Sequence, residues 1–314
     1  MLIQKVSIFL HARFHIHDRW QSYKKIIDQT EIHIVPQLPA PVRLQEYGVG
    51  IFNMALTKSA LKKVLKKQFI RVNDVIATSA TFINGGETIK LSVPEEIGPK
   101  KKLVFLLKIL FEDEHLAVIH KPAGILVSGN SFKTIANALP QNLKRSNLPD
   151  ATTPQPVHRL DYATTGILLV GKTSSSIRAL NKMFEDKKVK KTYYAITIGE
   201  MDFRGKITLK IDGKKSRSDY TLSESVPSKK FGHLNLLKLK PRTGRRHQLR
   251  KHLSTIGNPI LGDAAYGIEN LILKGKGLYL HAYSLKFIHP FTNEKVHLKD
   301  EFPQRFKKIF NKVK

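Results

Sequence analysis

The chain of 314 residues is predicted to be an α+β protein with two folded parts. Two hairpin signals indicate antiparallel strands: one spans residues 109–119, and the other turns at 212–213, an Asp-Gly pair typical of tight turns. An apolar helical stripe at 57–67 indicates an amphipathic helix. Proline, glycine and a lysine run at 94–102 predict a linker between a small N-terminal part and a larger C-terminal part.

The composition favours a folded protein that binds a polyanion. Hydrophobic residues make up 41% of the chain, and Lys and Arg number 54 against 25 Asp and Glu. The formal charge of +29 makes nucleic acid the first candidate partner, with a membrane surface as the competitor. No apolar run approaches the roughly 18 residues of a membrane span. Because the chain has no cysteine, disulfides, thiolate metal sites and thiol nucleophiles are excluded.

Residues 1–40 are predicted to form an N-terminal extension, to which we assign no function. Gln4 and Lys5 interrupt what would be the apolar core of a signal peptide, so we do not expect secretion. A structured N-terminus is preferred to an organelle-targeting peptide. His15 and His17 alternate as neighbours on a strand would, but without nearby carboxylates they do not predict a metal site.

Residues 41–93 are predicted to form a small unit with one basic helix. Thr57 has the side chain of an N-cap, and lysines at positions 58, 62, 63, 66 and 67 fill the faces beside the apolar stripe. Residues 69–74 predict a strand and a turn, and 88–93 a final strand. The lysine face of such a helix can lie on RNA phosphates; the alternative is an ordinary helix whose lysines are solvated.

The larger part begins with the hairpin at 109–119 and a Lys-Pro-Ala-Gly turn. An irregular connection rich in Pro, Asn and Thr is expected over 140–156. A Thr-Ser-Ser-Ser run at 173–176 can cap a helix that continues to residue 187. In the strand that follows, Tyr193 and Tyr194 point to opposite sides, and we expect Tyr194 in the core.

The most informative stretch is 157–170, where a polar cluster runs directly into apolar β-branched and leucine residues. This pattern predicts a turn that holds Asp161 at the start of a buried strand. Active sites are built in this way. The alternative for a single Asp in a turn is a hydrogen bond to its own backbone.

A second charged cluster opens a helix predicted over 245–256 and closed by Gly257. Arg246 and Arg250 are four residues apart and should share one helix face. The alternative is that these arginines bind only water or phosphate. The buried stripe of the helix is expected to comprise Leu249, Leu253 and Ile256.

The chain is then predicted to form a late strand over 278–290 and a basic helix over 302–314. His281 and His289 lie on the late strand. We expect these two histidines to orient neighbouring groups through hydrogen bonds rather than to act as acids or bases.

Three segments in order resemble motifs of one enzyme family. The sequence His158-Arg159-Leu160-Asp161, followed by Thr-Thr-Gly at 164–166, resembles the His-Arg-Leu-Asp motif of the large-ribosomal-subunit type of pseudouridine synthase. Lys-Thr-Tyr-Tyr-Ala at 191–195 is similar to the segment that carries the family's active-site tyrosine. The segment 244–250 resembles the family's Gly-Arg-Thr-His-Gln-Leu-Arg motif. The resemblance covers roughly residues 103–300.

The resemblance implies a bent, mainly antiparallel sheet flanked by helices for the catalytic domain, residues 103–314. It also implies that Asp161 is the nucleophile, that Tyr193 stacks on a base pulled from its helix, and that Arg250 pairs with Asp161 and keeps it ionised. Further residues are expected to contact RNA: His158, Arg159, Lys191 and, in place of a small hydroxyl residue of the family, Arg246.

The small N-terminal unit resembles an RNA-binding module first known from a small-subunit ribosomal protein. That resemblance implies phosphate contacts from three helix lysines: Lys62, Lys63 and Lys66. Gln68 and Asp74 stand where the module usually has glycine, so its turns could be rearranged.

Together these features predict an RNA pseudouridine synthase that acts on uridines in ribosomal or transfer RNA. Substrate and product are isomers, so we expect no cofactor, ATP or metal. We expect a monomer in the cytoplasm, without a membrane partner. The alternatives are a non-catalytic RNA-binding or assembly protein that kept the fold, and a DNA-directed N-glycosidase, which would also flip a base and use an Asp.

Overall fold

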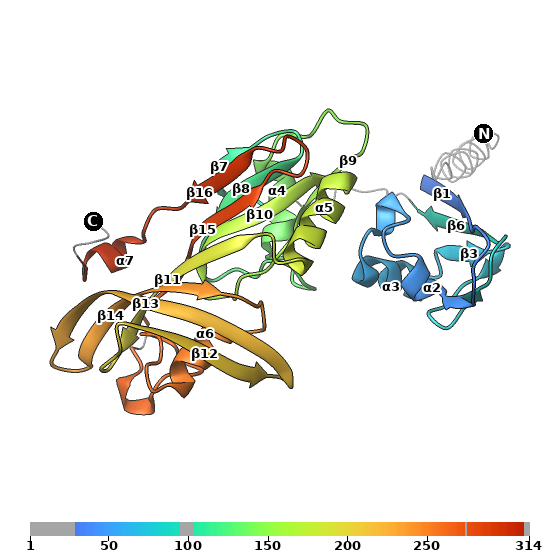
Figure 1. The fold of residues 1–314 in the computed structure, drawn as a ribbon. Helices are drawn as coiled ribbons and strands as arrows, with labels where there is room; N and C mark the ends of the chain where they lie inside the picture. Colours follow the sequence, from blue (N-terminus) through green and yellow to red (C-terminus); the bar gives the residue numbers. More distant parts are fainter. Residues whose placement is uncertain (1–28, 95–102, 274, 311–314) are drawn as a thin grey trace, which may run out of the picture. The chain divides into compact units, whose positions relative to one another are not determined.

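The structure is a computed structural model and describes residues 29–94, 103–273 and 275–310. The chain divides into two compact units, Met1–Lys101 and Lys102–Lys314, which are described separately (Figure 1). Most of the predicted N-terminal extension, including His15 and His17, lies outside the described residues, as does all but the first residue of the predicted linker.

The first unit is built on a four-stranded antiparallel sheet with the order β1-β6-β3-β4. A second, two-stranded sheet pairs β2 with β5. Helix α3 buries Leu61 and Leu65 in one core with Ile70, Ile89 and Leu91 of the larger sheet. The elements are β1 (Gln29–Ile34), β2 (Val42–Arg43), α2 (Leu44–Tyr47), η1 (Asn53–Ala55), α3 (Lys58–Lys66), β3 (Ile70–Val72), β4 (Val75–Ile76), β5 (Phe82–Ile83) and β6 (Thr88–Val93).

The predicted basic helix is confirmed as α3. The Thr57 side chain caps it by accepting a hydrogen bond from the Ala60 backbone N–H at 3.2 Å. Gln68 and Asp74 adopt left-handed backbones, with φ of 60° and 64°. These turns therefore keep the conformation that glycine would favour, although neither residue is glycine.

The second unit is built on a ten-stranded sheet whose main path is β12-β13-β14-β11-β15-β10-β8-β7. Strand β16 adds to β15 and β9 adds to β10, and every pairing except β10 with β15 is antiparallel. The strands are β7 (Lys108–Glu112), β8 (Leu116–Lys121), β9 (Ala151–Pro156), β10 (Thr165–Thr173), β11 (Lys190–Ile198), β12 (Arg204–Ile211), β13 (Lys214–Ser228), β14 (Gly232–Pro241), β15 (Leu280–Ile288) and β16 (Lys295–Lys299).

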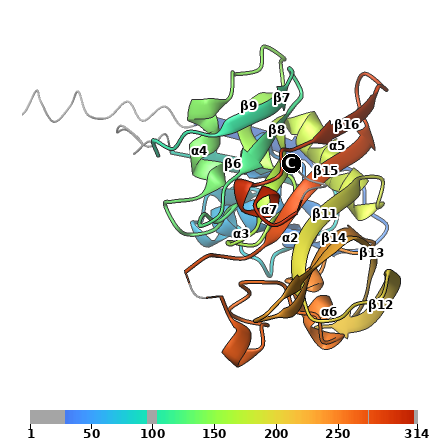
Figure 2. The ribbon, with the colours of Figure 1, turned by 90° about the vertical axis from the view of Figure 1, so that its left-hand side faces the viewer.

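The sheet has two halves, which meet at β11 and β15 (Figures 1 and 2). Helices α4 (Ile135–Asn142) and α5 (Ser174–Glu185) pack on the half that contains β8, β9 and β10. Helix α6 (Gln248–Thr255) packs on the half formed by β12, β13 and β14. A mainly antiparallel sheet flanked by helices is the predicted α+β fold, which is thereby confirmed. Short η2 (Glu269–Leu271) and α7 (Gln304–Lys307) complete the unit.

The parallel pairing between β10 and β15 is short and depends on Gly166. Only two residue pairs join these strands, Thr165 with His281 and Gly166 with Ala282. Gly166 has φ +115°, and a Cβ at this position would lie 2.2 Å from the Ala282 carbonyl oxygen. Because no other residue fits there, this glycine sets how closely β10 approaches β15. Asp161 lies four residues before the start of this pairing.

The connection over 140–156 is more regular than predicted. Helix α4 continues through Pro140, and residues 151–156 form strand β9, which pairs with one side of β10. Strand β9 contains Pro154 and Pro156. Proline is tolerated on an edge strand because no ladder partner needs its missing N–H there, so the proline-based prediction of an irregular connection was wrong.

Two helix predictions also need correction. Helix α6 begins at Gln248 and not at Arg245, since His247 has a left-handed backbone with φ 54°. Arg246 therefore lies before the helix and does not share a helix face with Arg250. Ile256 is 39% exposed, and the buried side is completed instead by Gln248 and His252. Among the described residues, the predicted C-terminal helix is only the four-residue α7.

Candidate active site

Asp161 lies in a turn that a buried lysine holds in place. The turn follows Leu160, which is buried, and ends at Thr164, whose backbone N–H donates to the Asp161 carbonyl at 3.0 Å. The Lys121 ammonium is fully buried and donates to the carbonyls of Pro122, Tyr162 and Thr164 at 2.8, 3.2 and 2.9 Å. All three of its protons have acceptors. Burial lowers the pKa of Lys121 to about 8, against the opposing effect of the Asp161 charge.

Arg250 faces Asp161, but its hydrogen-bonded ion pair is with a different carboxylate. Its Nε and Nη2 donate to the two oxygens of Asp263, each at 2.7 Å, and the Asp263 side chain is fully buried. The guanidinium also lies over the Tyr266 ring, 4.9 Å from its centroid. The remaining nitrogen, Nη1, lies 3.8 Å from Asp161 Oδ2, within ion-pair range but beyond a hydrogen bond. Asp263 and Tyr266 thus fix the guanidinium that faces Asp161.

Tyr193 lies at the junction of the two halves of the sheet. It is partly buried and packs against the hydrophobic cores of both halves, and it lines the same cleft as Asp161. Burial, with a smaller contribution from Asp161, raises the pKa of Tyr193, so its phenol stays neutral. Tyr194 points away and packs edge-on against Tyr283 and Phe302, as predicted from strand alternation.

His247 also lies close to Asp161, although it was not among the site residues predicted from the sequence. Its Nε2 lies 3.8 Å from Asp161 Oδ1, and its Nδ1 lies 2.9 Å from the Tyr266 hydroxyl. The signal was present, because a histidine stands in the family motif that the segment 244–250 resembles. The predicted helix start at Arg245 concealed it, because the left-handed backbone of His247 depends on contacts that are distant in sequence.

The buried side chain of Gln248, the next residue, bonds both to the loop before α6 and to a strand distant in sequence. Its Oε1 accepts hydrogen bonds from the Thr243 hydroxyl at 2.7 Å and the Arg245 backbone N–H at 3.0 Å. Its Nε2 donates to the Arg217 carbonyl and the Ser218 hydroxyl of β13, both at 2.9 Å. The loop before α6 is therefore folded onto the neighbouring strand, and the helix begins only after His247.

One large basic cleft of about 1500 Å³ is lined by the candidate site residues Asp161, Tyr193, His247 and Arg250. A typical small-molecule site measures about 300–1,000 Å³, so this cleft is large enough for part of a polymer. Asp161 and Glu185 are the carboxylate side chains in its lining, among a large excess of Lys and Arg. The excess of positive charge attracts a phosphate backbone.

The other predicted RNA contacts differ in exposure. Arg159 and Arg246 are exposed and line the cleft. Lys191 lines it with a partly buried side chain, and its ammonium lies 5.7 Å from the centre of the Phe184 ring. Outside the second unit, the predicted lysines of α3 are all exposed: Lys62, Lys63 and Lys66.

His158 has mainly structural contacts. Its Nε2 accepts a hydrogen bond from the Leu169 backbone N–H at 2.9 Å, and its ring stacks on Phe184. Burial lowers the pKa of His158 to about 3, so its imidazole is neutral and can serve as this acceptor. These contacts tie the start of the Asp161 turn to β10. An additional contact of His158 with RNA stays a prediction.

The two late histidines orient neighbours through hydrogen bonds, as predicted. His281 Nδ1 lies 2.9 Å from the Thr165 hydroxyl, and His289 Nε2 lies 3.0 Å from Asp113 Oδ2. Asp300 bonds to His120 and lies 3.7 Å from His281 Nε2. Burial lowers the pKa of His281 to about 4, so this histidine is neutral.

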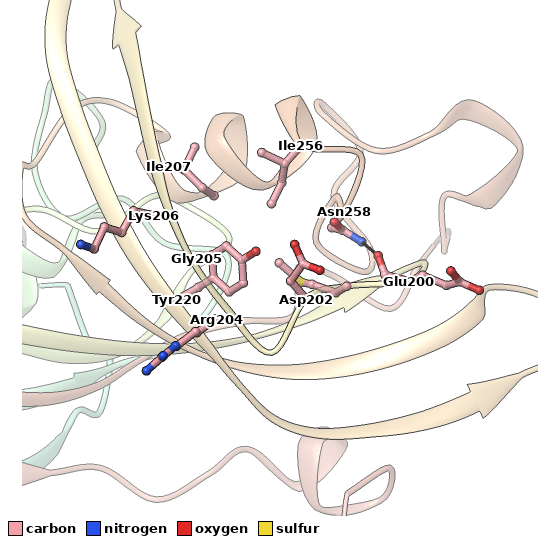
Figure 3. Close-up of a pocket in the computed structure, with 10 residues that line it drawn as sticks. Glu200, Asp202, Arg204, Gly205, Lys206, Ile207, Tyr220, Ile256 and Asn258 are labelled. Atoms are coloured by element: carbon pink, nitrogen blue, oxygen red, sulfur yellow. Dashed lines mark hydrogen bonds between the residues drawn. The ribbon is translucent and has the colours of Figure 1, made fainter.

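A smaller cavity of about 580 Å³ lies elsewhere in the second unit, near the end of α6 (Figure 3). Tyr220, Asp202 and Asn258 line it, and the side chains of Arg204 and Lys206 point away from its centre in the figure. It contains none of the predicted site residues. Among the described residues, no group of three His, Cys, Asp or Glu side chains could hold a metal ion, and no helix is long and apolar enough to cross a membrane.

Comparisons with known proteins point to one family. The family model "RNA pseudouridylate synthase" matches residues 115–255. An "Uncharacterized RNA pseudouridine synthase" of Aquifex aeolicus is 30% identical over 81% of this chain and 89% of that protein. "Ribosomal large subunit pseudouridine synthase D" of Nitrosomonas europaea is 31% identical over 76% of this chain and 75% of that protein. The solved "Human RNA Pseudouridylate Synthase Domain Containing 4" has a TM-score of 0.52 and 27% identity, covering 64% of this chain and 90% of that one.

Proposed function

Because the chain belongs to the RNA pseudouridylate synthase family, we propose that Asp161 is the nucleophile with which it converts uridine in ribosomal RNA to pseudouridine. The protein is an RNA pseudouridine synthase, which is an isomerase, and its substrate is RNA. The alternative of a non-catalytic protein that kept the fold is not favoured.

The groups that surround the Asp161 carboxylate support its assignment as the nucleophile. Of the two carboxylates in the cleft lining, Asp161 is the one that faces a fixed guanidinium and an imidazole at 3.8 Å, while Glu185 pairs with Lys182 on an exposed face of α5. The turn that carries Asp161 is held by a fully buried ammonium. A carboxylate carried by a turn that is held in this way can contact a reacting carbon with little loss of orientational freedom.

The proposed reaction uses the cleft as a pocket for an extruded nucleotide. Lysines and arginines of the lining bind phosphates, and the uracil stacks on the Tyr193 ring, which offsets lost base stacking by about 1–3 kcal/mol. Arg159 is exposed at the cleft and is proposed to fill the gap left in the RNA. Asp161 attacks at the ribose C1′ or at uracil C6, the glycosidic bond breaks, the base turns, and C5 bonds to the sugar.

Ribosomal RNA of the large subunit is the proposed substrate, with transfer RNA as the alternative. The support comes from several relatives that are named "Ribosomal large subunit pseudouridine synthase" C or D. The basic helix α3 is proposed to add affinity for structured RNA without reading its sequence. We further propose that the protein acts as a monomer in the cytoplasm.

Release of tritium from C5-labelled uridine in RNA tests these proposals. The wild-type protein should release tritium, and Asp161→Asn should abolish the release while RNA affinity changes less than about threefold, because the change keeps the size of the side chain. Glu185→Gln removes a carboxylate from the same cleft lining and should leave the rate unchanged. A wild-type protein that binds RNA without release is a binding protein only, and one that frees uracil or another base is an N-glycosidase. Retained release by Asp161→Asn would overturn the nucleophile assignment.

A further inference from the structure

The proposed reaction requires a base that removes a proton from carbon. When C5 bonds to the ribose, this carbon still carries its hydrogen. Pseudouridine forms only when the C5–H bond breaks, its electron pair restores the C5–C6 double bond and the proton moves to an acceptor. N1, released from the sugar, gains a proton in exchange. The step is balanced in protons and electrons and needs no oxidant or other reactant.

Most polar groups around Asp161 cannot accept that proton. Arg250 is always protonated, and the Lys121 ammonium is fully buried and donates to three carbonyls. Tyr193 could accept a proton only as phenolate. Burial and the nearby Asp161 charge raise the pKa of Tyr193 and thereby disfavour that form.

His247 has the required position. Its side chain is 21% exposed and lines the cleft, and its Nε2 lies 3.8 Å from Asp161 Oδ1. A nucleophile approaches its carbon to about 3–3.5 Å before reaction, so an atom 3.8 Å from the carboxylate can contact the same base. Its backbone has φ 54°, a left-handed conformation that histidine tolerates better than most residues and that aims the ring at Asp161.

The contact with Tyr266 prepares Nε2 as an acceptor. Nδ1 lies 2.9 Å from the Tyr266 hydroxyl. When Nδ1–H donates to this hydroxyl, Nε2 carries the lone pair and directs it into the cleft. The Tyr266 ring is itself fixed under the Arg250 guanidinium. The orientation of the imidazole is thus coupled to the same fixed arginine that faces Asp161.

The charges around His247 favour its neutral form. Burial lowers the pKa of His247 below its usual 6.5, Asp161 opposes this change, and Arg250, Arg246 and Lys251 reinforce it. Tyr266 is the other titratable group against the ring. At neutral pH the imidazole is therefore unprotonated, as a base must be before it accepts a proton.

We propose that His247 is a further catalytic residue, which takes the C5 proton onto Nε2 after the uracil has been rejoined to the ribose through C5. The imidazolium so formed lies beside the Asp161 carboxylate, which stabilises its charge, and it loses the proton to water through the open cleft. This inference rests on the proposed role of Asp161, since it places His247 relative to that side chain.

His247→Asn is the most direct variant because asparagine also tolerates a left-handed backbone and removes the imidazole. His233→Asn is the matched control, since His233 lies on β14 and does not line the cleft. Single-turnover tritium release should fall about 10²–10⁴-fold in His247→Asn and not in His233→Asn. RNA affinity and thermal unfolding of both variants should stay close to wild type, which shows that the fold is kept.

Two further readouts separate a base from a positioning residue. Deuterium at C5 should slow His247→Asn through a primary isotope effect, and added imidazole should restore part of the rate. The wild-type rate should be flat near neutral pH and fall below pH 6.5 as His247 becomes protonated, and His247→Asn should lack this decrease.

The outcomes also separate this inference from the proposal on Asp161. If Asp161→Asn abolishes release but His247→Asn retains the wild-type rate, His247 is not the base and Asp161 remains the nucleophile. A slow His247→Asn without isotope effect or imidazole rescue likewise overturns the inference. If Asp161→Asn remains active, the nucleophile assignment itself fails, whatever His247→Asn does.

Discussion

The cleft of the second unit and helix α3 of the first are both rich in cationic side chains, but they present them differently. In the cleft, Arg250 is fixed by a buried carboxylate and an aromatic ring, and the turn that carries Asp161 is held by Lys121, which is fully buried among carbonyls. On α3, Lys62, Lys63 and Lys66 are exposed to solvent. Charges held in one geometry can act on reacting atoms, whereas exposed and movable charges contribute mainly salt-dependent affinity.

The strongest test of this difference is Arg250→Met. It removes the partner of the fully buried Asp263 side chain, and breaking a buried ion pair costs about 3–5 kcal/mol of the free energy of unfolding. Activity should also be lost, because no guanidinium then faces Asp161. Urea denaturation and single-turnover tritium release measure the two effects.

Two companion variants make this test specific. Arg246→Met removes an exposed arginine of the same cleft and should change the free energy of unfolding by no more than about 0.5 kcal/mol. Combining Arg250→Met with Asp263→Asn removes the uncompensated charge and should recover much of the lost stability but none of the activity. Recovery of activity in the double variant would show that Arg250 acts only by neutralising Asp263.

A smaller effect is expected for the aromatic ring in the cleft. Tyr193→Ala removes the stacking surface and should weaken productive binding of the uridine by about 1–3 kcal/mol, roughly 5–150-fold in kcat/KM. Tyr193→Phe keeps the ring and should retain most of this binding. The comparison uses kcat/KM on one labelled RNA, and equal losses in both variants would mean that the hydroxyl, and not the ring, is required.

The smallest effect per residue is expected on α3. Changing Lys62, Lys63 and Lys66 together to Gln should weaken RNA binding and lower the slope of log affinity against log salt by about 2–3, with no change in the rate at saturating RNA. A matched triple change of Lys206, Lys210 and Lys214 to Gln removes the same charge from the exposed β12–β13 hairpin. Equal losses in the two triple variants would show that α3 has no dedicated contact with RNA.

Local patterns in the sequence predicted much of the fold. Thr173 caps α5 through a reciprocal pair of hydrogen bonds with Ser176, and the apolar run after Asp161 forms the fully buried β10. The alternation of side chains along β11 correctly predicted that Tyr193 and Tyr194 point to opposite sides of the sheet. These features depend on residues within a few positions of one another, so periodicity and capping chemistry suffice to predict them.

Edge positions and irregular turns were predicted less well. The prolines of β9 indicated a loop, but an edge strand accommodates them. The arginines before α6 fitted a helical pattern, but Gln248 bonds to β13 and delays the helix start. In both cases a partner distant in sequence decided the local conformation, and no local pattern records that partner.

By itself, the sequence determined most of the secondary structure around the site, although not the start of α6, and, through its motifs, the family and the candidates Asp161, Tyr193 and Arg250. Only the tertiary structure decided that Arg250 is held by Asp263 while it faces one oxygen of Asp161, and that His247 lies near the other oxygen of the same carboxylate. The physical reason is that short-range chemistry depends on distances of a few ångströms between side chains from different strands and loops. Those distances are set by sheet pairing, by Gly166 between β10 and β15, and by buried hydrogen bonds such as those of Lys121 and Gln248.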